Sequence, residues 1–196
     1  MYDYVSQFET EDMILNYGCI YGNEKILFIK AGLGGDYIGN ENKYFRIGRR
    51  LHERYGCSVI SISNPYIKNS SVDCDRKIIS DFIKKQDLKR PQLYFFGHSN
   101  GCIKGLELAA SGMDFQKMLL VNMPLMINFH KTKRWLAEIS QTDVIAVYGE
   151  RDPSYSYLPF INGRMDNLEV RIIPGADHNF AGRIDMFVAL ADELIG

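Results

Sequence analysis

The sequence lacks an excess of charge of either sign. Its 196 residues include 23 Lys and Arg against 24 Asp and Glu, for a net charge of −1. Because nucleic-acid binders draw much of their affinity from neutralising phosphates, this balance argues against a nucleic-acid partner. The densest basic stretches, KRPQ and HKTKR, are short and adjoin apolar segments, so we interpret them as solvated surface.

Long hydrophobic runs are also absent. The longest apolar stretch, MLLVNMPLMINF, is too short to span a bilayer and contains Asn122 and Pro124. The first residues have no basic start and no apolar core, so we expect no signal peptide. We therefore expect a soluble, cytoplasmic protein without a membrane span.

Cysteine is sparse and scattered. Four cysteines occur, at Cys19, Cys57, Cys74 and Cys102, and no two have CxxC spacing. This spacing does not suit a metal site, and a disulfide framework is unusual in a chain of this length. We expect reduced thiols in or near the core, and neither a metal nor a cofactor.

Short apolar runs alternate with amphipathic segments along most of the chain. Six apolar runs are typical of strands, at residues 25–32, 57–63, 92–97, 117–124, 143–150 and 168–175. Segments with helical spacing follow or separate them, at residues 42–56, 73–88, 100–112, 129–140 and 180–195. This alternation predicts a single α/β domain over residues 1–196, a three-layer α/β/α sandwich around a mostly parallel sheet.

Two local features refine this prediction. Residues 12–24 indicate two short strands around Tyr17 and Gly18, and hence an antiparallel hairpin at one edge of the sheet. Asp73 or Asp75 is expected to cap the helix over residues 73–88.

The stretch FFGHSNG places Ser99 between Gly97 and Gly101, directly after a strand and before a helix. A sharp strand-to-helix turn lifts a serine hydroxyl out of the backbone, and side chains two residues before and after it collide with their surroundings. The spacing Gly-x-Ser-x-Gly in this context predicts a nucleophile. The alternative is a glycine-rich turn with an incidental serine.

A serine nucleophile requires a base, and His178 is the histidine best placed for that role. It lies in PGADHNF, between the last strand and the last helix, where ligands of open α/β sheets bind. His52 and His130 lie in charged helices and are expected at the surface. His98 adjoins Ser99, so packing is its expected role.

The base requires a carboxylate, and Asp152 in YGERDP is the expected partner of His178. Glu150 and Asp177 compete with it. Asn122 stands at the end of the preceding strand but is an amide. The order Ser99, Asp152, His178 matches one known chain order of catalytic triads.

Two backbone N–H groups should bind the oxyanion of an acyl-transfer intermediate. One belongs to Asn100, which follows the nucleophile. The other is expected in KAGLGGDYIG, from Leu33 or next from Gly34. Because this loop lacks the Gly-x-x-x-x-Gly-Lys-Ser/Thr pattern, a nucleotide site is disfavoured.

Together these segments resemble the α/β-hydrolase fold superfamily. AGLGG is similar to its oxyanion loop, GHSNG to its nucleophile elbow, YGERD to its acid turn and GADHNF to its histidine loop. The last motif is similar to that of small carboxylesterases and serine-aminopeptidase-like hydrolases. The resemblance runs from about Leu27 to the C-terminus and implies an eight-stranded sheet whose second strand is antiparallel.

The sequence departs from this family in two places. Ala31, preceded by Lys30, stands where the family usually has a histidine that braces the oxyanion loop. The segment after Pro124 has room for one helix before the next strand, so no cap domain is expected.

The expected function is hydrolysis of a small-molecule ester, or alternatively a thioester or an amide, through an acyl-enzyme on Ser99. Gly34, Met123, Leu125 and Met126 are candidates for the substrate pocket, although the last three equally suit packing of a helix onto the sheet. Two alternatives stay open: a non-catalytic protein that binds a ligand or partner, and an acyltransferase with the same triad.

Overall fold

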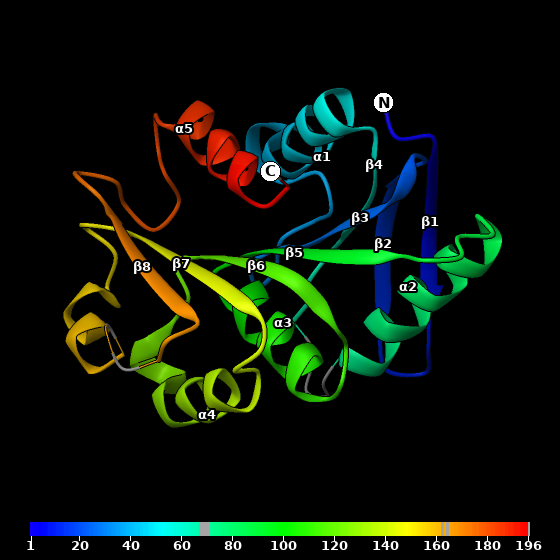
Figure 1. The fold of residues 1–196 in the computed structure, drawn as a ribbon. Coiled ribbons are helices and arrows are strands. Elements are labelled where there is room, and N and C mark those ends of the chain that lie inside the picture. The colour runs from blue at the N-terminus through cyan, green and yellow to red at the C-terminus, as the bar shows by residue number, and fades with distance from the viewer. Residues whose placement is uncertain (67–70, 162, 164, 196) are drawn as a thin grey trace.

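Eight strands form one sheet in the computed structural model, which describes residues 1–66, 71–161, 163 and 165–195 (Figure 1). In chain order the strands are β1 (Tyr4–Glu9), β2 (Ile14–Ile20), β3 (Asn23–Lys30), β4 (Cys57–Ile62), β5 (Gln92–His98), β6 (Phe115–Val121), β7 (Asp143–Gly149) and β8 (Leu168–Ile173). The helices are α1 (Lys43–Tyr55), α2 (Val72–Lys85), α3 (Asn100–Ala110), α4 (Leu125–Glu138) and α5 (Ile184–Ala189), with short 3₁₀ helices η1 (Asn40–Asn42), η2 (Tyr155–Phe160) and η3 (Leu190–Glu193).

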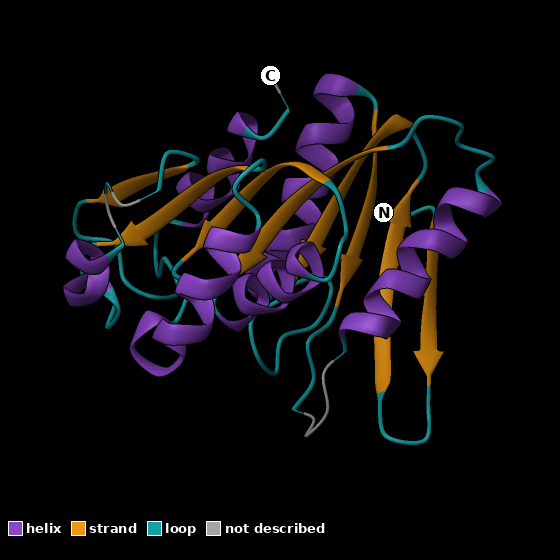
Figure 2. Cartoon of the chain, turned by 60° about the horizontal axis from the view of Figure 1, so that its bottom comes forward, coloured by secondary structure: helices purple, strands orange, loops and turns teal. Residues whose placement is uncertain are grey.

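The strand order is β1-β2-β4-β3-β5-β6-β7-β8, and β2 runs antiparallel to both of its neighbours while the other pairs are parallel. Helices α1 and α5 cover one face of the sheet, and α2, α3 and α4 cover the other (Figures 1 and 2). These layers confirm the predicted α/β/α sandwich. Within the described part of the chain, no helix combines the length and apolar character needed to cross a membrane.

The core lies on both faces of the sheet because successive strand residues point to opposite sides. On β3, Phe28 packs with the core under α2 and α3, whereas Leu27 and Ile29 pack under α1 and α5. On β5, Phe95 and Phe96 divide in the same way. Continuous apolar runs in the central strands therefore reflect burial on two sides.

The edge hairpin forms earlier in the chain than predicted. Strands β1 and β2 pair across a turn in which Thr10 N–H donates to Met13 O at 2.9 Å, and Tyr17 and Gly18 lie inside β2. A Cβ on Gly18 would stand 2.7 Å from the ring of Tyr2. The glycine therefore permits close packing in a strand and does not mark a turn.

The N-cap prediction for α2 is wrong. The helix begins at Val72, Ser71 precedes it, and Asp75 is buried inside it. Asp75 turns toward the sheet, where Lys30 Nζ donates to its Oδ1 at 2.7 Å and Ser71 Oγ donates to its Oδ2 at 3.2 Å. Both charged side chains are almost fully buried, so the carboxylate serves as a buried ion-pair partner.

Removing one member of this pair leaves a buried charge without compensation. We predict that Lys30→Met lowers the free energy of unfolding by about 3–5 kcal/mol. The double variant Lys30→Met/Asp75→Leu should regain most of that loss, because neither charge is then left behind. Urea denaturation measures both values, and a loss below about 1 kcal/mol in the single variant would contradict the assignment.

Candidate active site

Ser99 occupies a sharp turn between β5 and α3, with φ of 54° and ψ of −126°. The flanking glycines are required by space. A Cβ on Gly97 would lie 2.9 Å from the backbone N of Cys102, and a Cβ on Gly101 would lie 2.3 Å from the carbonyl oxygen of Lys30. The collisions predicted from the Gly-x-Ser-x-Gly spacing are therefore confirmed.

The hydroxyl of Ser99 contacts a histidine, which in turn contacts a carboxylate. Ser99 Oγ lies 2.9 Å from His178 Nε2, and His178 Nδ1 lies 2.5 Å from Asp152 Oδ2. A carboxylate only accepts, so Nδ1 carries the proton and Nε2 is free to accept from the serine hydroxyl. The structure thus brings together three side chains that are separated by up to 79 residues.

These side chains follow β5, β7 and β8, whose carboxyl ends share one edge of the sheet. Asp152 is 4% exposed, and its Oδ1 accepts from Ser154 N–H at 2.7 Å. The side chain of His178 is 34% exposed. The carboxylate is therefore held firmly, and the histidine faces the open side of the cleft.

The two competing carboxylates bind elsewhere. Glu150 Oε2 accepts from Gly175 N–H at 2.7 Å. Asp177 Oδ1 accepts from the backbone N–H groups of Ala181 and Asn179, and these bonds lower the pKa of Asp177. Of the three candidates, Asp152 is the one that contacts the imidazole of His178.

The loop after β3 runs beside Ser99, and most of its N–H groups have acceptors. Gly32 N–H donates to Tyr44 Oη at 3.2 Å, Gly34 N–H to Asn64 O at 2.7 Å and Gly35 N–H to Gly32 O at 2.9 Å. Within the described residues, the N–H of Leu33 has no acceptor. The same holds there for the N–H of Asn100, at the start of α3.

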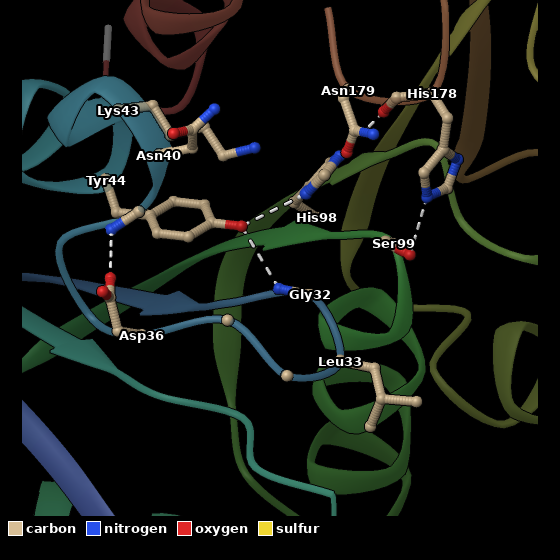
Figure 3. Close-up of a pocket in the computed structure, with 13 residues that line it drawn as sticks. Gly32, Leu33, Asp36, Asn40, Lys43, Tyr44, His98, Ser99, His178 and Asn179 are labelled. Carbon is tan, nitrogen blue, oxygen red and sulfur yellow. Dashed lines mark hydrogen bonds between the residues drawn. The ribbon is translucent and has the colours of Figure 1, made fainter.

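A cavity of about 470 Å³ opens beside Ser99 (Figure 3). Its walls are formed by residues from the loop after β3, the start of α1, the end of β5 and the loop after β8: Gly32, Leu33, Gly34, Gly35, Asp36, Gly39, Asn40, Lys43, Tyr44, His98, Ser99, His178 and Asn179. Within the described chain, no cluster of three or more His, Cys, Asp or Glu suits a metal ion.

The four residues predicted to line a substrate pocket lie in different places. Gly34 lies in the cavity wall. Met123 and Leu125 are fully buried in the core, so the packing alternative holds for them. Met126 is 51% exposed and lies outside that wall. The cavity is bordered by Lys43 and Tyr44 of α1, and no described residue of α4 lines it.

No family model matches the chain, and no curated protein is similar to it in sequence. Solved structures are similar in fold. Est1E from Butyrivibrio proteoclasticus superposes with a TM-score of 0.76 at 14% identity, covering 96% of both chains. A serine hydrolase homologue from Coxiella burnetii gives 0.74 at 18% identity, covering 100% of this chain and 99% of that one. A serine hydrolase without a lid from Xanthomonas campestris gives 0.68 at 14% identity, with coverage of 98% and 95%.

The chain has the α/β-hydrolase fold. Several side chains that fix the loops around the cleft were not identified from the sequence.

The first of these side chains in the α/β-hydrolase fold is Asn122, whose Nδ2 donates to His178 O at 2.8 Å and to Asp177 O at 3.1 Å. Its Oδ1 accepts from Gly149 N–H at 2.8 Å. Asn122 thereby ties the histidine loop to Gly149 at the end of β7, three residues before Asp152.

His98 is a second support of the histidine loop. Its Nε2 lies 2.9 Å from His178 O, which only accepts, so Nε2 carries the proton. Its Nδ1 then accepts from Tyr44 Oη at 3.1 Å, and Tyr44 in turn accepts from Gly32 N–H. The imidazole of His98 thus connects the histidine loop with the loop after β3. Packing was the role expected from the sequence, and His98 also forms these hydrogen bonds.

Asn64 supports the loop after β3 from the other side. Its backbone pairs with Gly34 and Gly35, and its Nδ2 donates to Ala31 O at 3.0 Å and to Asn100 Oδ1 at 3.1 Å. Asn64 was not identified from the sequence, because an Asn-Pro pair after a strand ordinarily marks only the end of that strand.

The buried state of His98 predicts a pH-dependent stability. Burial, with a smaller effect of the Lys43 charge, lowers the pKa of His98 from 6.5 to about 3. Between these values the unfolded chain binds a proton that the folded chain does not, so stability is full above pH 6.5 and falls toward pH 3. Between about pH 6.5 and about pH 4.5, wild type should lose about 2 kcal/mol more than His98→Gln. Denaturant titrations at each pH measure this difference, and equal losses would contradict the neutral assignment.

Proposed function

We propose that the protein is a serine hydrolase that cleaves an ester, in the manner of carboxylesterases, through an acyl-enzyme on Ser99. The observation that carries this proposal is the hydrogen-bonded series Ser99–His178–Asp152 at the carboxyl edge of the sheet. It combines a nucleophile, a base with its acceptor nitrogen toward the nucleophile, and a buried carboxylate. The α/β-hydrolase fold supports this proposal, but one fold hosts many activities, so the proposal depends on the site.

Each residue has one role in the proposed reaction. Ser99 Oγ attacks the acyl carbonyl while His178 Nε2 accepts its proton. The ester bond breaks, and the imidazolium returns the proton to the leaving alkoxide. Water then attacks the acyl-enzyme with His178 again as base, which releases the acid and restores Ser99. Asp152 fixes the tautomer of His178 and stabilises the imidazolium.

The oxyanion is proposed to bind the N–H groups of Leu33 and Asn100. Gly34 is the weaker candidate because its N–H already donates to Asn64 O at 2.7 Å. Asn64 contacts the residues around both proposed donors, through Ala31 O and Asn100 Oδ1, so it positions them together. Preorganised donors of this kind are each worth about 10²–10³-fold in rate.

We also propose that the chain is a single domain without a cap. Helix α4 fills the connection between β6 and β7 and packs against α3. His178 stays partly exposed at the cleft, which supports direct access for a small-molecule substrate. One of the similar structures is itself a serine hydrolase without a lid.

Covalent labelling tests the nucleophile. A fluorophosphonate probe should label wild type in proportion to active protein, with the phosphonyl group on Ser99, and should not label Ser99→Ala. Ser111→Ala is a matched control because Ser111 ends α3 away from the cleft, and it should label normally. If folded wild type fails to react, the non-catalytic binding alternative is favoured.

Replacing the acid tests the role of Asp152. We predict that Asp152→Asn lowers kcat for a p-nitrophenyl ester by about 10³–10⁴-fold, because the amide no longer holds the required tautomer of His178. Glu150→Gln is the control and should keep most of the activity, since its amide oxygen still accepts from Gly175 N–H. Steady-state kinetics and circular dichroism measure both variants. Near-normal turnover by Asp152→Asn would reject its role.

A further inference from the structure

The cavity beside Ser99 has a reactive end and a distant end. Ser99 and His178 form the reactive end. Tyr44 and His98 form the wall between, and Lys43 and Asn40, from the start of α1, bound the far side (Figure 3). With about 470 Å³ the cavity is large enough for a small organic ester. A substrate held at Ser99 therefore places its remaining atoms toward Lys43.

Lys43 is unusual among the lysines of this chain. It is 6% exposed, although lysine is rarely buried without a partner. Within residues 1–66, 71–161, 163 and 165–195, its ammonium group forms neither an ion pair nor a hydrogen bond. The Nζ of Lys43 instead lies over two aromatic rings. It is 5.3 Å from the centre of the Tyr44 ring and 4.9 Å from the centre of the Phe187 ring.

The chain itself shows how a structural buried lysine is satisfied. Lys30 is equally hidden, and its Nζ lies 2.7 Å from the carboxylate of Asp75. No carboxylate of the described residues stands in that relation to Lys43. Asp36 lines the same cavity, but its Oδ1 accepts from Ile38 N–H and Gly39 N–H.

The surroundings of Lys43 suit a bound anion. The two aromatic rings favour a cation beside them but do not accept hydrogen bonds as oxygen does. Burial lowers the pKa of Lys43, and the negative charge of Glu41 opposes this only in part, so the charged form lacks the solvation it has in water. A carboxylate in the cavity would supply the missing hydrogen-bond acceptor and place a negative charge in direct contact with the ammonium group.

From this we propose that the ester carries a carboxylate away from the scissile bond and that Lys43 binds it. This inference rests on the proposed serine-hydrolase function and narrows its substrate class. The single positive charge of Lys43 matches the single negative charge of a carboxylate. Asn40 and Asn179 line the cavity and offer amide N–H donors for the same group.

Matched ester pairs test this preference in wild type. One pair compares mono-p-nitrophenyl glutarate with p-nitrophenyl valerate, which have acyl chains of equal length. The other compares p-carboxyphenyl butyrate with phenyl butyrate, so that the carboxylate is on the alcohol side. Wild type should show a kcat/KM about tenfold higher for the charged member of one pair. Preference for the neutral member in both pairs would overturn the proposal.

Variants then assign the preference to Lys43. In Lys43→Met the ratio of kcat/KM for the charged over the neutral ester should fall about tenfold or more. Lys43→Arg should retain part of the ratio because it keeps the charge. Lys84→Met removes an exposed lysine from the far end of α2 and should leave the ratio unchanged. A ratio in Lys43→Met equal to that of wild type would overturn the assignment.

The two proposals fail in different ways. If wild type hydrolyses the neutral esters and reacts with the fluorophosphonate but shows no charge preference, only the inference about Lys43 is wrong. If wild type neither hydrolyses any ester of the two pairs nor reacts with the probe, the proposed hydrolase function itself is wrong. Should Lys43→Met fail to fold, the comparison of the two ester pairs in wild type still decides the substrate class.

Discussion

The backbone turn at Ser99 is the constraint on which the cleft depends. A non-glycine residue at φ of 54° is strained, at a cost of about 1–3 kcal/mol. Two hydrogen bonds offset that strain: Ser99 N–H donates to Val121 O at 2.8 Å, and Cys102 N–H donates to Ser99 O at 3.0 Å. The turn also brings α3 so close to β3 that only glycine fits at position 101. This one turn therefore exposes the serine hydroxyl. It also sets the position of the start of α3 against β3 and its adjoining loop.

Buried polar side chains extend this constraint to the other loops. Asn122 and His98 donate to the backbone oxygen of His178, and Asn64 and Tyr44 bond to the backbone of the loop after β3. Because these groups are buried, each unmade hydrogen bond would carry a desolvation penalty, so the network favours one arrangement of the loops. A rigid cleft of this kind is suited to chemistry in which donors must be in place before charge develops.

The sequence was sufficient to predict features that depend on the order of strands, helices and short motifs along the chain. Alternating runs predicted the layers, and the motifs around Ser99, Asp152 and His178 lie at strand ends, which meet in any parallel sheet. The sequence did not predict the location of side chains that are compatible with two different environments. Met123 and Leu125 follow a strand and suit either a pocket or the core. Lys43 begins a helix, and a lysine there ordinarily faces solvent, so its burial depends on the packing of α5 against α1.

A crystal structure of the protein after reaction with a phosphonate ester tests the central claim most directly, since the adduct resembles the proposed tetrahedral intermediate. Phosphorus should be bonded to Ser99 Oγ, with one phosphonyl oxygen about 2.7–3.1 Å from the backbone N atoms of both Leu33 and Asn100. His178 should remain bonded to Asp152. A phosphonyl oxygen directed away from these N–H groups would rule out the proposed oxyanion site, and phosphorus on another side chain would rule out Ser99 as the nucleophile.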